Sequence, residues 1–274
     1  MTRWALLIEY DGGAFSGWQR QAHDISVQEV LEAAASRLDG APVASTAAGR
    51  TDAGVHAAGQ VVHIDLTRVI TPESLASALN FHMKPHPVAV LRAAIVADDW
   101  SARFSAIGRR YRYTILNRAA RPALETRAWH VRAPLDVSAM QDGAAYLLGR
   151  HDFTSFRAAS CQAKSAVRTL DLLDIARDGE RIAVLAEARS FLHHQVRNMV
   201  GSLKLVGEGK WPPARIGDAL QARNRAAAGP TAPPDGLVLE AVRYPGVVLG
   251  AEERRPGALP LDPAGVRDPR PPRI

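Results

Sequence analysis

The segment from residue 48 to residue 56, AGRTDAGVH, places a single carboxylate, Asp52, two residues after a permanent cation, Arg50. Gly49 and Gly54 allow a sharp backbone turn here and the close approach of a large ligand. A lone acid beside an arginine favours an ionised nucleophile over a proton donor. Asp and Gly are also common turn residues, so an ordinary surface turn is the competing interpretation.

Residues 109–113, RRYRY, alternate cations and rings in the manner of a strand. With a period of two, Tyr111 and Tyr113 share one face, and Arg110 and Arg112 share the other. Rings can stack on bases while arginines contact phosphates, which suits nucleic acid. A strand with two core tyrosines and a solvated cationic face fits this pattern equally well.

Residues 191–201, FLHHQVRNMVG, begin a long helix that the apolar spacing predicts to run to about residue 206. Arg197 lies at the border of its apolar stripe. An arginine in that position tolerates burial when it is paired with a carboxylate, and Asp52 is the attractive partner. Such a pair would keep Asp52 ionised and oriented; a surface arginine is the alternative.

No metal or nucleotide cofactor is expected from the motifs. The close histidine pairs are His82 with His86 and His193 with His194, and neither has Cys or Glu at ligand spacing. Prolines beside His86 also break the helix that the first pair would need. The chain contains neither the phosphate-binding loop nor the dinucleotide fingerprint, so no nucleotide cradle is expected.

The composition is that of a globular protein with a basic balance. Of 274 residues, 47% are hydrophobic and 23% are charged, and the net charge is +6, which favours polyanionic partners such as nucleic acid. Cys161 is the single cysteine, so an intramolecular disulfide is impossible and a reducing compartment fits. Neither a signal peptide nor a membrane-length apolar run is present, and we therefore expect a cytoplasmic protein without a membrane partner.

The elements that must position these side chains fall into two α+β halves. The first half is predicted to hold strands at 4–10, 60–66 and 88–96 and helices at 27–38 and 71–80. The second is predicted to hold strands at 110–116, 167–176, 181–188 and 237–244 and helices at 136–148, 191–206 and 213–221. We place the domains at 1–105 and 106–245, and we expect the Pro- and Arg-rich tail, 246–274, to be disordered.

Seven segments, in this order, resemble the tRNA pseudouridine synthase A family. They are YDGGAFSGWQRQ (10–21), GRTDAGVHA (49–57), WSARFSA (100–106), RRYRY (109–113), HDFTSFRAASCQ (151–162), FLHHQVRNMVG (191–201) and RAAAGPTAPPDGL (225–237). Together they span most of the chain up to about residue 245.

This resemblance implies an isomerase that converts uridine to pseudouridine at nucleotides 38, 39 and 40 of the tRNA anticodon arm without a cofactor. It also implies two similar α/β domains, each a mostly antiparallel sheet backed by helices, a basic cleft between them, and a homodimer. By position, Asp52 matches the nucleophile and Arg197 its paired cation. Tyr111 matches the ring that stacks on the target base, and Arg50 matches the arginine that fills the gap left by the flipped nucleotide.

Two other functions remain open. One is a non-catalytic tRNA-binding protein on the same scaffold, which would give Asp52 no task. The other is a nucleoside glycosidase, although such enzymes usually pair two acids and no second carboxylate stands beside Asp52 in its segment. Whether Asp52 attacks C6 of the base or C1′ of the ribose, or assists a glycal route, is also open.

Overall fold

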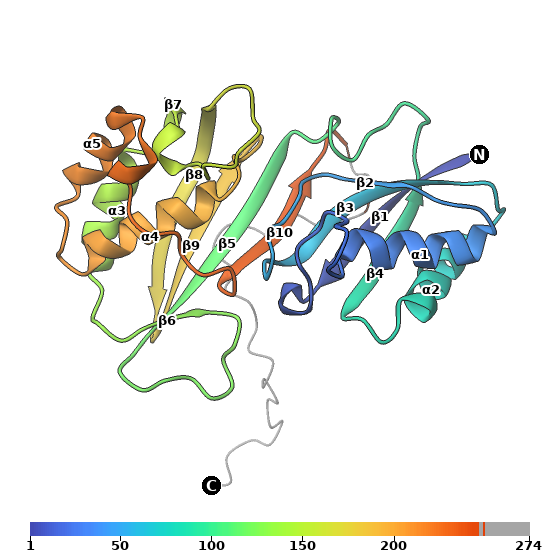
Figure 1. Ribbon diagram of the computed structural model, residues 1–274, viewed down its shortest axis with the longest axis horizontal. Coiled ribbons are helices and arrows are strands. Elements are labelled where there is room, and N and C mark those ends of the chain that lie inside the picture. Colours follow the sequence, from blue (N-terminus) through green and yellow to red (C-terminus); the bar gives the residue numbers. More distant parts are fainter. Residues whose placement is uncertain (247–248, 250–274) are drawn as a thin grey trace, which may run out of the picture.

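The two predicted halves share one continuous sheet. The computed structural model describes residues 1–246 and residue 249. Its strands form a mixed ten-stranded sheet with the order β4-β1-β3-β10-β5-β9-β8-β7, in which β2 pairs with β3 and β6 pairs with β5 (Figure 1). The predicted α+β class is confirmed, and the two mostly antiparallel sheets are joined edge to edge.

The first half is built around β1. This strand (Thr2–Tyr10) pairs antiparallel with β3 (His56–Leu66) and with β4 (Val88–Ile95). The remaining elements of this half are α1 (Val27–Asp39), β2 (Ser45–Ala47) and α2 (Pro72–Met83). The side chain of Ser26 accepts a hydrogen bond from the backbone N–H of Glu29, which is the capping arrangement that starts α1.

The second half is a mostly antiparallel sheet with three helices. Its strands are β5 (Gly108–Asn117), β6 (Trp129–Val131), β7 (Gly149–Asp152), β8 (Val167–Asp178) and β9 (Arg181–Ala188). Its helices are α3 (Val137–Ala145), α4 (Gln195–Gly207) and α5 (Ala214–Ala222). Short 3₁₀ helices lie at Gly12–Ala14, Thr154–Phe156 and Arg225–Ala227.

The strand that joins the halves comes last in the sequence. β10 (Leu237–Arg243) runs parallel to β3 and antiparallel to β5. An ion pair between Arg112 on β5 and Glu240 on β10 reinforces this join.

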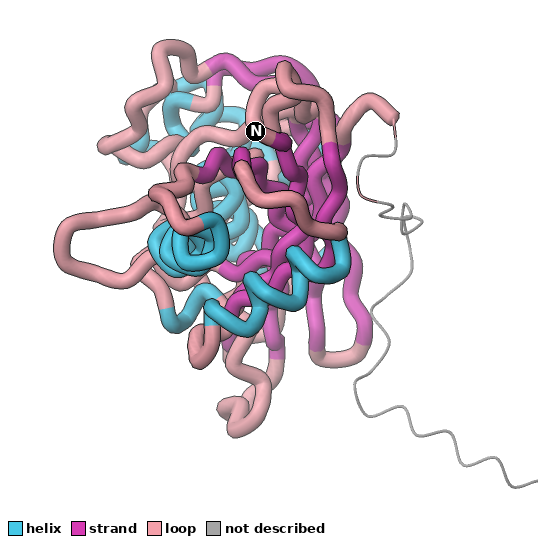
Figure 2. Tube along the Cα trace, turned by 90° about the vertical axis from the view of Figure 1, so that its right-hand side faces the viewer, coloured by secondary structure: helices cyan, strands magenta, loops and turns pink. Residues whose placement is uncertain are grey.

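All five α-helices cover the same face of the sheet, as the side view shows (Figure 2). Between sheet and helices lies one hydrophobic core that extends through both halves. Its largest buried side chains include Trp4, Trp18, Tyr113, Phe153 and Phe156.

Three helix boundaries differ from the sequence prediction, and one of them is the end of α2, which lies at Met83 instead of about residue 80. α4 begins at Gln195 instead of residue 191, because His194 adopts a left-handed backbone conformation with φ of 62°. α3 ends at Ala145 instead of residue 148, and a turn follows it. The division at residue 105 stays a prediction, and the expected disordered tail falls almost wholly outside the described residues. None of the helices in the described part of the chain is long and apolar enough to cross a membrane.

Candidate active site

Asp52 lies on the loop between β2 and β3, and its side chain is 18% exposed. The first half of the molecule holds this loop firmly. The carbonyl of Thr51 accepts a hydrogen bond from the N–H of Trp18 at 3.1 Å, and the hydroxyls of Thr51 and Tyr10 are hydrogen-bonded at 2.8 Å. The carboxylate is therefore presented from a fixed backbone.

Two glycines allow this loop to pack closely. Gly17 has φ of +96°, and a Cβ there would lie 2.7 Å from the carbonyl oxygen of Thr51. Gly54 has φ of +79°, and a Cβ there would lie 2.8 Å from the side chain of Pro234. The sharp turn expected after Asp52 is thus present at Gly54. A Cβ on Gly49 would meet open space, so Gly49 leaves room for a ligand beside Arg50 without relieving any contact.

The guanidinium of Arg197 contacts Asp52 from the other half of the molecule. Nη1 of Arg197 donates to Oδ2 of Asp52 at 3.0 Å, and Nε donates to the carbonyl of Ala232 at 2.8 Å. The Arg197 side chain is only 12% exposed. Because two hydrogen bonds fix the guanidinium plane, a partly buried ion pair is held in one orientation across the join.

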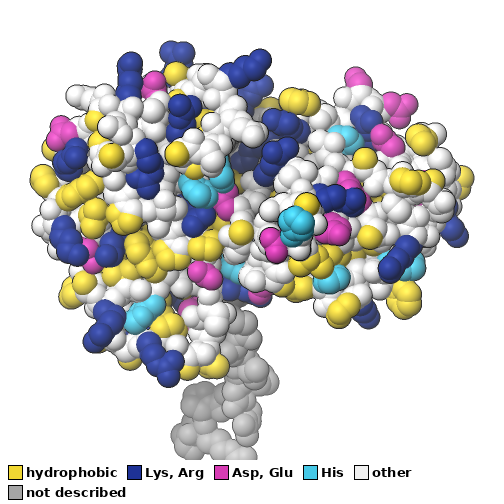
Figure 3. Space-filling model, viewed as in Figure 1, with side chains coloured by type: hydrophobic (Ala, Val, Ile, Leu, Met, Phe, Trp, Pro, Cys, Tyr) yellow, Lys and Arg dark blue, Asp and Glu magenta, His cyan; other side chains and the backbone are white. Residues whose placement is uncertain are grey.

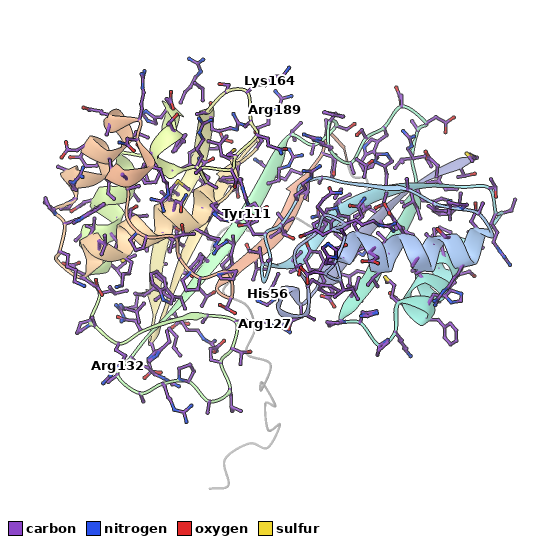
Figure 4. All side chains as sticks on the ribbon, viewed as in Figure 1. His56, Tyr111, Arg127, Arg132, Lys164 and Arg189 are labelled. Atoms are coloured by element: carbon purple, nitrogen blue, oxygen red, sulfur yellow. The ribbon has the colours of Figure 1, made fainter. Side chains whose placement is uncertain are left out.

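Tyr111 lies on β5 at the join, as Figure 4 shows, and its side chain is buried. Its ring packs edge-on against Phe191, with ring centroids 5.3 Å apart. Burial raises the pKa of Tyr111, and the nearby Tyr10 and Asp52 raise it further. The phenol is therefore neutral at neutral pH and lies close to the carboxylate.

Arg50, the fourth residue that the resemblance singles out, is exposed to solvent two positions before Asp52.

The arginines of β5 make contacts within the protein that stabilise the fold. Arg110 pairs with Glu187, and Arg112 pairs with Glu240. The buried Arg109 donates to carbonyls on three segments, including that of Ala48 at 2.7 Å. The contacts of these arginines favour the structural interpretation of RRYRY over a role in binding nucleic acid.

Two histidines that the sequence analysis did not connect with Asp52 flank its carboxylate. Nε2 of His193 lies 3.3 Å from Oδ1, and Nε2 of His194 lies 3.5 Å from Oδ2. Burial lowers the pKa of His194, against the opposing effect of Asp52. Ligand spacing compares each histidine pair only with acids and cysteines nearby in sequence. A carboxylate supplied by the other half of the molecule therefore escapes it. The adjacent histidines 193 and 194, shortly before Arg197, are the feature of the sequence that could have indicated this contact.

Cations gather around this site. Figure 3 shows Lys and Arg side chains at the join between the two halves, and Figure 4 places Lys164 and Arg189 above Tyr111. A pocket of about 400 Å³ lies between the 3₁₀ helices of the second half, and its lining includes Arg157, Arg223 and Arg225. Ala158 also lines this pocket and donates its N–H to the carbonyl of His193 at 2.9 Å, so the pocket adjoins the segment that carries the two histidines.

Comparisons with known proteins identify the family of this chain. The family model described as tRNA pseudouridine synthase matches residues 6–105 and 144–245. The chain therefore belongs to the tRNA pseudouridine synthase family and is an isomerase, as the resemblance implied.

The similar proteins carry a more specific name, tRNA pseudouridine synthase A. The protein of that name from Acidiphilium cryptum is 66% identical over 247 residues, which cover 89% of this chain and 97% of the relative. The one from Paramagnetospirillum magneticum is 59% identical over 245 residues, covering 89% of this chain and 96% of the relative. The one from Gluconobacter oxydans is 55% identical over 249 residues, covering 89% and 90%.

Proposed function

We propose that this enzyme isomerises uridine to pseudouridine at nucleotides 38, 39 and 40 of the tRNA anticodon arm, with Asp52 as the nucleophile. The observation that carries the proposal is the Asp52–Arg197 pair, in which a carboxylate from one half is held by a guanidinium from the other. A cation at 3.0 Å favours the ionised form that a nucleophile needs.

The reaction needs a carboxylate more than any other group. The bond from C1′ to N1 of the base breaks, a bond from C1′ to C5 forms, the hydrogen at C5 leaves as a proton, and N1 gains one. Atoms and electrons balance without an oxidant or reductant. Asp52 can add to C6, attack C1′ or assist a glycal route, and each route begins from an ionised carboxylate.

The flipped nucleotide gives Arg50 and Tyr111 their roles. A base must leave the helix stack to reach Asp52, at a cost of a few kcal/mol. The exposed Arg50, beside the open space at Gly49, supplies hydrogen bonds to the gap left behind. Tyr111, close to Asp52 and neutral, holds the extruded ring and relays the C5 proton.

The proposed assembly is a homodimer that binds the tRNA anticodon arm across both subunits in the cytoplasm. The net charge of +6 supports a polyanionic partner. The unpaired Cys161 fits a reducing compartment.

The direct test is Asp52→Asn, assayed by tritium release from tRNA whose uridines carry tritium at C5. We expect release to fall to background while tRNA binding stays close to that of the wild type, because the amide keeps the shape and loses the nucleophile. Asp174→Asn, at an exposed position on β8, is the matched control and should keep full activity. Normal release by Asp52→Asn would refute the assignment.

A further inference from the structure

Asp52, His193 and His194 bring three metal-ligand atoms together in a way that the isomerisation scheme does not use. One ligand atom from each residue lies within 4.8 Å of the other two. A carboxylate with two imidazoles is a ligand set that suits zinc and the neighbouring divalent transition metals.

The contacts of the Asp52 carboxylate approach the spacing of a tetrahedral site, with each histidine lying against a different carboxylate oxygen. With metal–ligand bonds of about 2.1 Å, adjacent ligand atoms of a tetrahedron are about 3.4 Å apart. Oδ1 of Asp52 lies 3.3 Å from Nε2 of His193, and Oδ2 lies 3.5 Å from Nε2 of His194. The side chain of His193 is 41% exposed, so its ring can rotate to bring Nε2 toward the ligand atoms of the other two residues. An ion can also enter the site from solvent.

The backbone at His194 is independent support for a role beyond packing. Its φ of 62° is a left-handed conformation that costs a residue other than glycine about 1–2 kcal/mol. This conformation sets His194 just before α4 with its ring beside that of His193, the ring centroids being 4.1 Å apart. This conformation places both imidazoles beside the Asp52 carboxylate.

We propose that Asp52, His193 and His194 bind a divalent transition-metal ion such as Zn²⁺ from solution and that the bound ion inhibits the enzyme. The ion takes the carboxylate that must attack the uridine and fills the space where the base would stack. The site is inhibitory, and the ion is not a cofactor. The binding half of this proposal stands on geometry alone, whereas the inhibition rests on the proposed role of Asp52.

Arg197 opposes the ion, which gives the proposal a distinctive signature. Its guanidinium already donates to Oδ2 of Asp52 at 3.0 Å and carries a like charge toward the metal. Removing it with Arg197→Ala should therefore tighten metal binding, although the same change should impair isomerisation. A residue that merely held the loop in place would weaken both.

The test titrates the purified full-length protein with Co²⁺ and follows the visible absorption of tetrahedral cobalt, then displaces the cobalt with Zn²⁺. We expect one ion per chain in the wild type. His193→Asn, His194→Asn and Asp52→Asn should each weaken binding by about tenfold or more, because each removes one of three ligands. Asparagine tolerates the left-handed conformation, so His194→Asn keeps the local backbone.

His23→Asn is the matched control, since His23 is an exposed histidine on the loop before α1, and its binding should equal that of the wild type. Wild-type affinity in all three ligand variants, or binding without tetrahedral absorption, would overturn the site. Circular dichroism of each variant verifies the fold.

The inhibition is measured separately as tritium release with and without Zn²⁺, each variant being compared with its own zinc-free rate. Wild-type activity should fall with added Zn²⁺ and return with a chelator, and the loss should need at least about tenfold more Zn²⁺ in His193→Asn. Zinc-insensitive wild-type release would overturn the inhibition. Absent release without zinc would instead refute the proposed function and leave the cobalt result standing.

Discussion

The Asp52 carboxylate receives a different partner on each oxygen. Oδ1 lies against His193, whereas Oδ2 accepts from Arg197 and lies near His194. Oδ1 is thus beside the more exposed group and Oδ2 beside the more buried ones. We infer that Oδ1 is the oxygen that meets the substrate, because Oδ2 is already held by a fixed donor.

The Arg197 contact can be tested by a series of three substitutions. Lysine keeps the charge but cannot match the planar fork that reaches both Asp52 and the carbonyl of Ala232. Alanine removes the charge, and glutamate places two carboxylates together. We expect kcat/KM to fall in the order Lys, Ala, Glu, with the alanine variant about a hundredfold below the wild type.

Tritium release measures this series, and thermal unfolding separates activity from folding. The control is Arg37→Ala in the last turn of α1. Equal residual activity in Arg197→Ala and Arg197→Glu would contradict a functional contact with Asp52.

At this scale the motifs predicted part of the site. Asp52 and Arg197 were paired from their types and their places in the pattern, and the structure brings them together. The two histidines escaped because their relation to Asp52 exists only after the halves join. Opposite charge suggested the pairing of Arg197 with Asp52, whereas spacing along the chain gives no such signal for histidines supplied by the other half.

At the scale of elements, the start of α4 shows how local packing overrides periodicity. The apolar spacing extends back to residue 191, yet residues 191–194 are not helical and α4 begins at Gln195. The carbonyl of His193 accepts from the N–H of Ala158 at 2.9 Å, and the N–H of Leu192 donates to the side chain of Gln195 at 2.8 Å. These bonds replace the first helical turn and free both imidazoles to face Asp52.

The loop that carries Asp52 packs against Gly17, where there is no room for a side chain. Gly17→Ala should combine the cost of a left-handed alanine with a contact of 2.7 Å to the carbonyl of Thr51. Gly40→Ala is the matched control, since Gly40 also has a positive φ, of +78°, but a Cβ there meets open space.

We expect Gly40→Ala to lower the free energy of unfolding by about 1 kcal/mol and to keep activity. Gly17→Ala should cost more and should also lower kcat, because the carboxylate is displaced with its loop. Chemical denaturation and tritium release measure the two effects. Equal stability losses with full activity in both variants would show that the loop tolerates the side chain.

At the scale of the whole molecule, three buried tyrosines and the half-buried Tyr244 predict instability at alkaline pH. Burial raises the pKa of Tyr10 to about 12 and also raises those of Tyr111, Tyr113 and Tyr244. In the unfolded chain a tyrosine ionises near a pKa of about 10. Above that pH the folded state binds more protons than the unfolded state, so the free energy of unfolding falls as the pH rises from about 10 to about 12.

Denaturant unfolding at pH 8 and at pH 11 measures this loss, and tyrosinate absorbance should rise together with unfolding. Tyr244→Phe removes one of the four groups and should reduce the dependence on pH. A free energy of unfolding that stays constant across this range would contradict the prediction.

The overall class was predictable from the sequence, because strand and helix periods and caps such as Ser26 are local. The continuous sheet was not. β10 was predicted as a strand at 237–244, but nothing in its seven residues, LVLEAVR, says that it lies between β3 and β5. Its two neighbours are fixed by long-range pairing, which a local pattern does not encode.

The central place of β10 has a consequence for how the chain reaches its native state. Until residues 237–243 have been synthesised, β5 lacks its antiparallel partner along residues 108–113, and β3 lacks its parallel partner at His56 and Ala57. A nascent chain of about the first two hundred residues therefore has two incomplete sheets with unpaired edges. Such edges are prone to pair wrongly with each other or with neighbouring chains. Only the late arrival of one short strand completes both sheet edges at once, and with them the join at which Asp52 meets Arg197.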